Sequence, residues 1–137
     1  MIVSPNVFTK DISGQLASAP VIAYNQTVTG QITDTTKYVV YAFSAKAGDK
    51  IRITMRRSQN NNGGNLDAEL FLMGGANGGS QIDYNDDAGD PALGATDARI
   101  NHTMTADGTY IIVATHYGVD IGGTTGNFTL QLTGPTH

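Results

Sequence analysis

Residues 51–56 read IRITMR, and this stretch decides the class of fold. The apolar side chains of Ile51, Ile53 and Met55 alternate with three polar side chains. Successive side chains of a β-strand point to opposite faces of a sheet, so the apolar residues share one face and the polar residues share the other. The pattern predicts a strand that has one face on the core and one face toward water.

Six further segments have the same alternation or a strand-like composition. They are residues 27–33, 38–45, 68–72, 100–104, 110–114 and 128–132. Glycine-rich and asparagine-rich stretches recur along the chain, and helices of ordinary length do not fit between these stretches. We therefore predict an all-β fold, an antiparallel β-sandwich of jelly-roll or Greek-key type with about seven to nine strands.

The chain is 137 residues long, which suits a single domain with one core. Residues 1–20 contain two prolines and no sustained alternation, so they are expected to form an N-terminal arm or an edge strand. Residues 21–137 are expected to form the β-sandwich domain.

The charge of the chain argues against two classes of partner. The formal net charge is −4, whereas nucleic acids and anionic membranes require clustered Lys and Arg. Arg52, Arg56 and Arg57 come closest to such a cluster, but no aromatic stacking platform accompanies them, and they are expected to be solvated at a strand end. No segment approaches the roughly 20 apolar residues that span a bilayer, so neither nucleic-acid binding nor membrane insertion is predicted.

Residues 83–90 read DYNDDAGD and form the densest acidic stretch of the chain. Carboxylates so close in a loop repel one another, and an oxygen-only ligand set in a glycine-rich setting favours Ca²⁺. The alternative is a solvated loop that keeps the protein soluble. The candidate calcium ligands are Asp86, Asp87, Asp67, Asp97, Asn85 and Asp90.

No complete catalytic site is evident in the sequence, so the protein is not expected to be an enzyme. The acidic residues are crowded into one loop instead of lying on two sides of a sugar cleft. The histidines have no zinc-site spacing, and His102 has the inward-facing parity of its strand. No cysteine is present, and no GxSxG motif presents a serine nucleophile.

Six segments in order resemble the bacterial pre-peptidase C-terminal domain. They are residues 23–32, 38–55, 66–73, 82–90, 98–115 and 126–132, with the most specific motifs at 43–49, 67–72, 85–87 and 107–110. The resemblance implies a jelly-roll-like sandwich that accompanies secreted hydrolases. Domains of this kind are non-catalytic, and related ones bind collagen, carbohydrate or calcium.

Two functions follow as expectations. The first is a non-catalytic, secreted or cell-surface, calcium-stabilised accessory module that recognises a polymer, either an extracellular protein or a polysaccharide. Its candidate contacts are aromatic residues expected to be exposed, namely Tyr84, Tyr117, Tyr24 and Phe71. The alternative is a self-assembling subunit of an extracellular filament or surface array, in which residues 1–20 pair as an exchanged strand with another copy.

Overall fold

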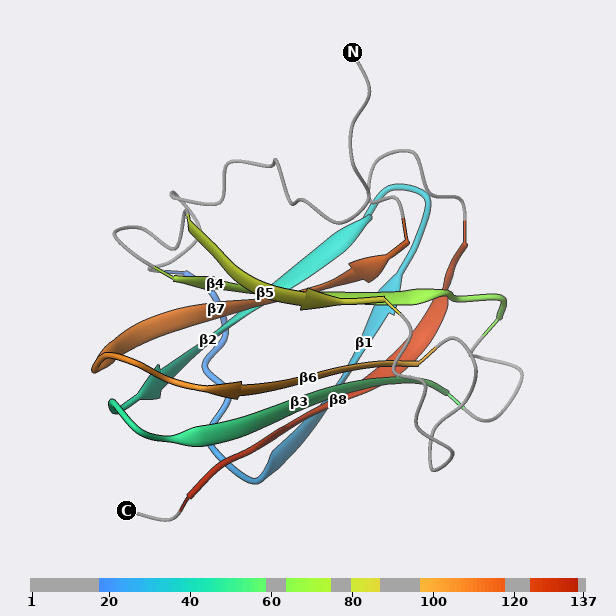
Figure 1. Cartoon of the computed structure of the whole chain (residues 1–137). Helices are drawn as coiled ribbons and strands as arrows, with labels where there is room; N and C mark the ends of the chain where they lie inside the picture. The colour runs from blue at the N-terminus through green and yellow to red at the C-terminus, as the bar shows by residue number, and fades with distance from the viewer. Residues whose placement is uncertain (1–17, 59–63, 75–79, 87–96, 118–123, 136–137) are drawn as a thin grey trace.

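The computed structural model describes residues 18–58, 64–74, 80–86, 97–117 and 124–135, and within them eight antiparallel strands form two facing sheets (Figure 1). The strands are β1 (Gln26–Ile32), β2 (Tyr38–Ala45), β3 (Lys50–Arg57), β4 (Ala68–Gly74), β5 (Ser80–Asn85), β6 (Ala98–Thr103), β7 (Gly108–His116) and β8 (Gly126–Thr133). No helix in this part of the chain is long and apolar enough to cross a membrane.

The order of the strands is that of a jelly roll. One sheet has the order β1-β8-β3-β6 and the other has the order β2-β7-β4-β5. Consecutive strands lie in opposite sheets except for β4 and β5, which form a hairpin within the second sheet. The predicted all-β sandwich is confirmed, and the arrangement is that of two Greek keys wrapped into eight strands.

The alternation in the sequence builds the core between the two sheets. Ile51, Ile53 and Met55 of β3 are nearly or fully buried, and Met55 lies in the space between the sheets. Leu70 and Leu72 meet them from β4 in the same apolar cluster. Burying a side chain of this size contributes about 1.5–3 kcal/mol, so this layer is the main source of stability.

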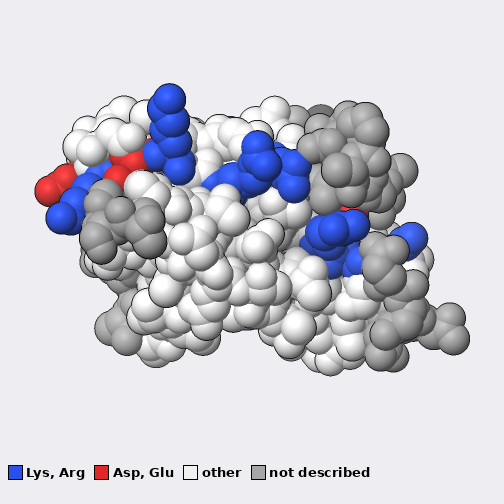
Figure 2. Space-filling view, turned by 90° about the horizontal axis from the view of Figure 1, so that it is seen from below, with Lys and Arg blue, Asp and Glu red and all other residues white. Residues whose placement is uncertain are grey.

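The outer faces of the two sheets differ in character. On the second sheet, apolar side chains of β2, β4 and β7 form a further buried cluster that includes Val40, Phe71 and Val113. On the first sheet, the outer face is polar, and Lys and Arg side chains form a row across it (Figure 2). Every residue of β4 is buried, because both faces of this strand are covered.

The residues just before β1 belong to the folded domain. The amide of Ala42 donates to the carbonyl of Pro20 at 2.8 Å, and the amide of Ile22 donates to the carbonyl of Ala42 at 2.9 Å. Val21 thereby forms a parallel bridge with Ala42 at the outer edge of β2. Ala19 is buried in the apolar cluster on the outer face. The contacts of the sandwich therefore begin at least as early as residue 19.

Candidate functional site

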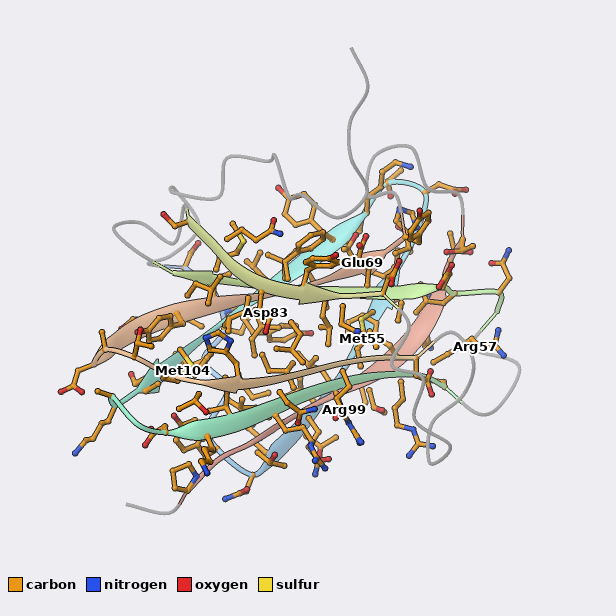
Figure 3. The ribbon with its side chains drawn as sticks, in the orientation of Figure 1. Met55, Arg57, Glu69, Asp83, Arg99 and Met104 are labelled. Atoms are coloured by element: carbon orange, nitrogen blue, oxygen red, sulfur yellow. The ribbon has the colours of Figure 1, made fainter. Side chains whose placement is uncertain are left out.

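Strand β5 was missing from the sequence-based prediction. Asp83 and Asn85 were expected in an acidic loop, and that placement is wrong, because Ser80–Asn85 pairs with β4 through Leu70 opposite Asn85 and Leu72 opposite Asp83. Asp83 projects from β5 toward β6 (Figure 3). The sequence pattern does not indicate this strand, since every side chain of β5 is exposed or half-buried and no apolar face stands out.

Side chains of β5 join the two sheets along one open side of the sandwich. The Oδ2 atom of Asp83 lies 3.1 Å from Nδ1 of His102 on β6. The amide of Arg99, also on β6, donates to Oδ1 of Asn85 at 3.0 Å. His102 has the inward parity that the sequence indicated, and it is partly buried against this carboxylate. We call this pair of contacts the β5–β6 seam.

The described members of the predicted calcium set belong to segments that lie at the same end of the sandwich. Asp67 immediately precedes β4, Asp86 immediately follows the antiparallel β5, and Asp97 immediately precedes β6. The hydrogen bond from Arg99 to Asn85 joins the start of β6 to the end of β5. The topology thus brings segments that are 30 residues apart in the chain to the same edge.

Two of these predicted ligands have structural roles. Asp97 is only 2% exposed, and its Oδ1 accepts a hydrogen bond from the amide of Arg57 at 2.9 Å. Its Oδ2 lies 3.8 Å from Nε of Arg56. Asn85 is engaged in the β5–β6 seam through its side-chain oxygen. Both side chains fix strand ends, and this role explains their position without a metal ion.

Two backbone hydrogen bonds fix the position of Asp67. Its amide donates to Oγ1 of Thr124 at 3.1 Å, and its carbonyl accepts from the amide of Tyr117 at 2.9 Å. Among the described residues, no three His, Cys, Asp or Glu side chains gather in a way that could hold a metal ion. Asp87 and Asp90 lie outside the described residues, so the calcium set stays a prediction.

Glu69 is a buried carboxylate that the sequence reasoning did not single out as a core residue. It is fully buried on β4, on the side of the strand away from the core, opposite Thr115 of β7 (Figure 3). The available signal was the apolar run of residues 70–73 directly after Glu69, which is typical of a strand buried on both faces.

A groove of about 710 Å³ opens at the opposite end of the molecule from Asp67. It lies among residues 21–25, 44–46 and 107–109, and its lining is mainly apolar. Val21, an aliphatic side chain next to a sheet edge, is 76% exposed at this groove. We call this feature the Val21 groove.

Tyr24 anchors one wall of the Val21 groove. Its hydroxyl donates to Oδ2 of Asp49 at 2.6 Å. This carboxylate oxygen of Asp49 also accepts a hydrogen bond from the amide of Lys46 at 2.9 Å. Burial, the hydrogen bond to Asp49 and the charge of Asp49 together raise the pKa of Tyr24. Gly134 packs directly on the ring of Tyr24, because a Cβ atom at Gly134 would lie 2.8 Å from it. The ring is therefore a fixed structural element.

The four aromatic candidates do not form one surface. Tyr84 and Tyr117 are 41% and 44% exposed, and both belong to the second sheet or its immediate end. Tyr24 lies beside the start of β7, whereas Tyr117 lies just beyond the end of this strand, about 27 Å away along an extended chain. The expectation that Phe71 is exposed is wrong, because its ring is completely buried in the outer cluster.

The fold and the arrangement of these residues define a small jelly-roll module with a groove at one end. Residues 37–116 match the bacterial pre-peptidase C-terminal domain, and this match covers more than half of the chain. The chain belongs to this family. Comparison with curated protein sequences gives no match.

Solved structures of three other proteins are similar to this fold. The pre-peptidase C-terminal domain of the collagenase from Bacillus anthracis has 16% identity and a TM-score of 0.63, over 84% of this chain and 94% of that one. PliG from Aeromonas hydrophila, a periplasmic lysozyme inhibitor of g-type lysozyme, has 15% identity and a TM-score of 0.54, over 85% and 97% of the two chains. PliG from Salmonella Typhimurium has 17% identity and a TM-score of 0.53, over 85% and 100%. At these identities the likeness concerns the fold alone.

Proposed function

We propose that this domain is a non-catalytic binding module of a secreted or cell-surface protein and that it recognises an extended segment of a protein partner in the Val21 groove. Membership of a family of accessory domains supports the non-catalytic part. The occurrence of the same fold in periplasmic lysozyme inhibitors supports a role in protein recognition outside the cytoplasm.

The observation that carries this proposal is the combination of a mainly apolar groove with an exposed aliphatic side chain beside a sheet edge. Residues 44–46, at the end of strand β2, line the groove, and β2 is the outermost strand of its sheet. Residues 20–22 already pair with this edge at Ala42, so an extended peptide would add beside residues 44–46. There it would gain backbone hydrogen bonds, while pockets along it select side chains. The size and apolar lining of the Val21 groove suit one or two aliphatic side chains of the partner.

A protein partner fits the Val21 groove better than a polysaccharide does. Sugar rings bind by stacking on an open aromatic face, and Tyr24 is the aromatic residue in the lining of this groove. Gly134 lies against the ring of Tyr24, and Phe43 lies 6.4 Å from it between centroids. The ring is thus engaged by its own chain, which favours recognition of side chains over stacking of sugars.

The test uses fibrillar collagen and a g-type lysozyme as probes, with binding measured by biolayer interferometry. Val21→Asp places a charge in the apolar groove and should weaken binding at least about tenfold, because an unpaired charge is costly to desolvate. Val21 is 76% exposed, so the variant should keep the melting temperature of the parent.

The matched control is Tyr117→Asp, which changes an exposed apolar side chain at the other end of the sandwich. It should leave binding unchanged. Loss of binding in Tyr117→Asp but not in Val21→Asp would move the site to the end that carries Tyr84 and Tyr117. Failure of both probes to bind would remove the support that the similar structures lend to the proposal.

A calcium ion at the end that carries Asp67 and Asp86 is the finer part of the proposal. Its support is the convergence of the segments around β4, β5 and β6 and the hardness of carboxylate ligands. Because Asp97 and Asn85 already hold strand ends, the ion would depend on Asp67 and Asp86 together with Asp87 and Asp90. Bound calcium would offset repulsion among these carboxylates and so stabilise the folded state.

Self-assembly through residues 1–20 is the alternative proposal. One observation favours it: the residues that follow the arm already add to a sheet edge, through the bridge between Val21 and Ala42. An arm that continues along the edge of another copy would extend this pairing between molecules.

A further inference from the structure

The outer face of the first sheet combines positive charge with a lack of acidic and aromatic side chains. On each strand, the residues that alternate with the core positions point outward. These outward residues are Thr27, Thr29 and Gln31 of β1, Asn127, Thr129, Gln131 and Thr133 of β8, Lys50, Arg52, Thr54 and Arg56 of β3, and Arg99, Asn101 and Thr103 of β6. None of them is acidic, although the chain as a whole carries a net charge of −4.

Four of the eight Lys and Arg residues of the chain lie on this face. Figure 2 shows Lys and Arg side chains spread in a row across this face, with acidic atoms visible toward its two ends. We call this row the basic row and define it by Lys50, Arg52, Arg56 and Arg99. The nearby carboxylate of Asp97 is buried at one end of the row and lies 3.8 Å from Nε of Arg56. This carboxylate lies at the Arg56 end of the row, away from Lys50 and Arg52.

Neutral neighbours hold the arginines in place on the sheet. The Nε atom of Arg52 donates to Oδ1 of Asn101 on the adjacent strand at 2.9 Å. The Nε atom of Arg99 donates to Oγ1 of Thr54 at 3.1 Å. These bonds order the two guanidinium groups, and neither of the two acceptors carries a negative charge. Ordered guanidinium groups lose less side-chain entropy when they bind a carboxylate, to which Arg can donate two parallel hydrogen bonds.

The spacing of the basic row matches an extended polypeptide. Alternate residues of a strand lie about 6.6–6.8 Å apart, so the span from Lys50 to Arg56 is about 20 Å. An extended acidic peptide has the same repeat, because its alternate side chains also lie on one face. A shallow hollow of about 430 Å³ between Lys50, Arg52 and Asn101 offers room for a first carboxylate.

We propose that the basic row binds an acidic polypeptide segment in an extended conformation, as a second interaction surface separate from the Val21 groove. Charge complementarity and the matching repeat argue for this partner. The lack of aromatic residues at the outward positions argues against stacked nucleotide bases, and it argues likewise against sugar rings. The Thr, Asn and Gln side chains beside the row supply hydrogen bonds to the backbone of the peptide.

The experiment titrates ¹⁵N-labelled protein with poly-L-glutamate and follows amide shifts by NMR. At an ionic strength of about 0.01 M, where the Debye length is about 30 Å, shifts should concentrate on residues 50–56 and 99–103, and affinity should fall steeply toward 0.15 M. The double variant Lys50→Gln/Arg52→Gln should weaken binding about tenfold or more, since it removes two complementary charges. Both residues are exposed, so the fold should be kept.

The matched control for the single variant Arg52→Gln is Lys37→Gln, which removes the same charge just before β2 of the other sheet, away from the basic row. An equal loss in this control would overturn the proposal, because binding would then follow net charge alone. Polygalacturonate or oligothymidylate that binds as tightly as poly-L-glutamate would also overturn it, since the row would not select an extended polypeptide. Absence of amide shifts on β3 and β6 would likewise overturn the proposal. Val21→Asp should leave this binding unchanged, so failure here and failure of the groove proposal are distinguishable.

Discussion

Removal of one hydroxyl group, in Tyr24→Phe, tests how the wall of the Val21 groove is held. The lost interaction is the 2.6 Å hydrogen bond to the carboxylate of Asp49, a residue only 5% exposed. A hydrogen bond to a charged group contributes about 1.5–3 kcal/mol, whereas the ring and its packing on Gly134 are unchanged. For a chain of this length, that loss lowers the melting temperature by about 5–10 °C.

The control is Tyr110→Phe, which removes a 2.6 Å hydrogen bond from the hydroxyl to the neutral carbonyl of Ala106. A neutral hydrogen bond contributes about 0.5–1.5 kcal/mol, so the melting temperature should fall by about 2–5 °C. Thermal unfolding followed by circular dichroism at pH 7 measures both changes. If Tyr24→Phe is no more destabilising than Tyr110→Phe, Asp49 does not hold Tyr24 as a charged acceptor and the reasoning is refuted.

The environment of Tyr24 also predicts that the stability of the fold falls at alkaline pH. Burial, with the hydrogen bond to Asp49 and its charge, raises the pKa of Tyr24 above the value of about 10 found in unfolded chains. The folded state therefore favours the neutral phenol, and this contribution is complete below about pH 10 and declines as the pH rises further. Tyr24→Phe should reduce the loss of stability above pH 10. Burial also raises the pKa of Tyr41, so part of the loss should persist in the variant.

Three further predictions concern the two ends of the molecule. Asp97→Ala leaves the part-buried amide of Arg57 without its acceptor and should cost about 1–3 kcal/mol in urea unfolding, by the same amount with and without calcium. Calcium should raise the melting temperature of metal-stripped protein, and Asp86→Ala should abolish that difference; equal curves for the stripped parent protein would reject the site. Deletion of residues 1–17 should lower stability and leave a monomer if the arm pairs within its own chain, or dissolve an assembly and keep the domain folded if it pairs with a neighbour. Light scattering separates these outcomes, and unchanged size together with an unchanged melting temperature would contradict both.

The sequence predicted the strands whose pattern reflects one buried face. Ile51, Ile53 and Met55 alternate with polar residues because β3 has water on its other side. The same rule failed for Phe71, which alternates with the core residues Leu70 and Leu72 and was expected to be exposed. Its strand is buried on both faces, and the continuous apolar run of residues 70–73 was the signal of this burial.

The candidate sites were less predictable, because they depend on neighbours that are distant in the chain. The basic row needs β6 beside β3, and no local pattern shows that Arg99 will pair with Thr54. The Val21 groove likewise joins residues near 21, 44 and 108. Asp97 was singled out for its charge, but its role in binding the amide of Arg57 follows from a tertiary contact over 40 residues.

The strand order has a consequence for how this chain reaches its folded state during synthesis. Strand β1 pairs only with β8 among the described strands, and β8 also separates β1 from β3. The first sheet therefore cannot be completed until residues 126–133, which form β8, have left the ribosome. The β4–β5 hairpin is the one pair of consecutive described strands that are adjacent in a sheet. Every other pair of described strands joins segments that are distant in the chain, so a long loop must close before the pair forms. We therefore expect folding in milliseconds to seconds. The first sheet of a growing chain therefore stays incomplete until its last strand is made, and the core between the two sheets closes only after that.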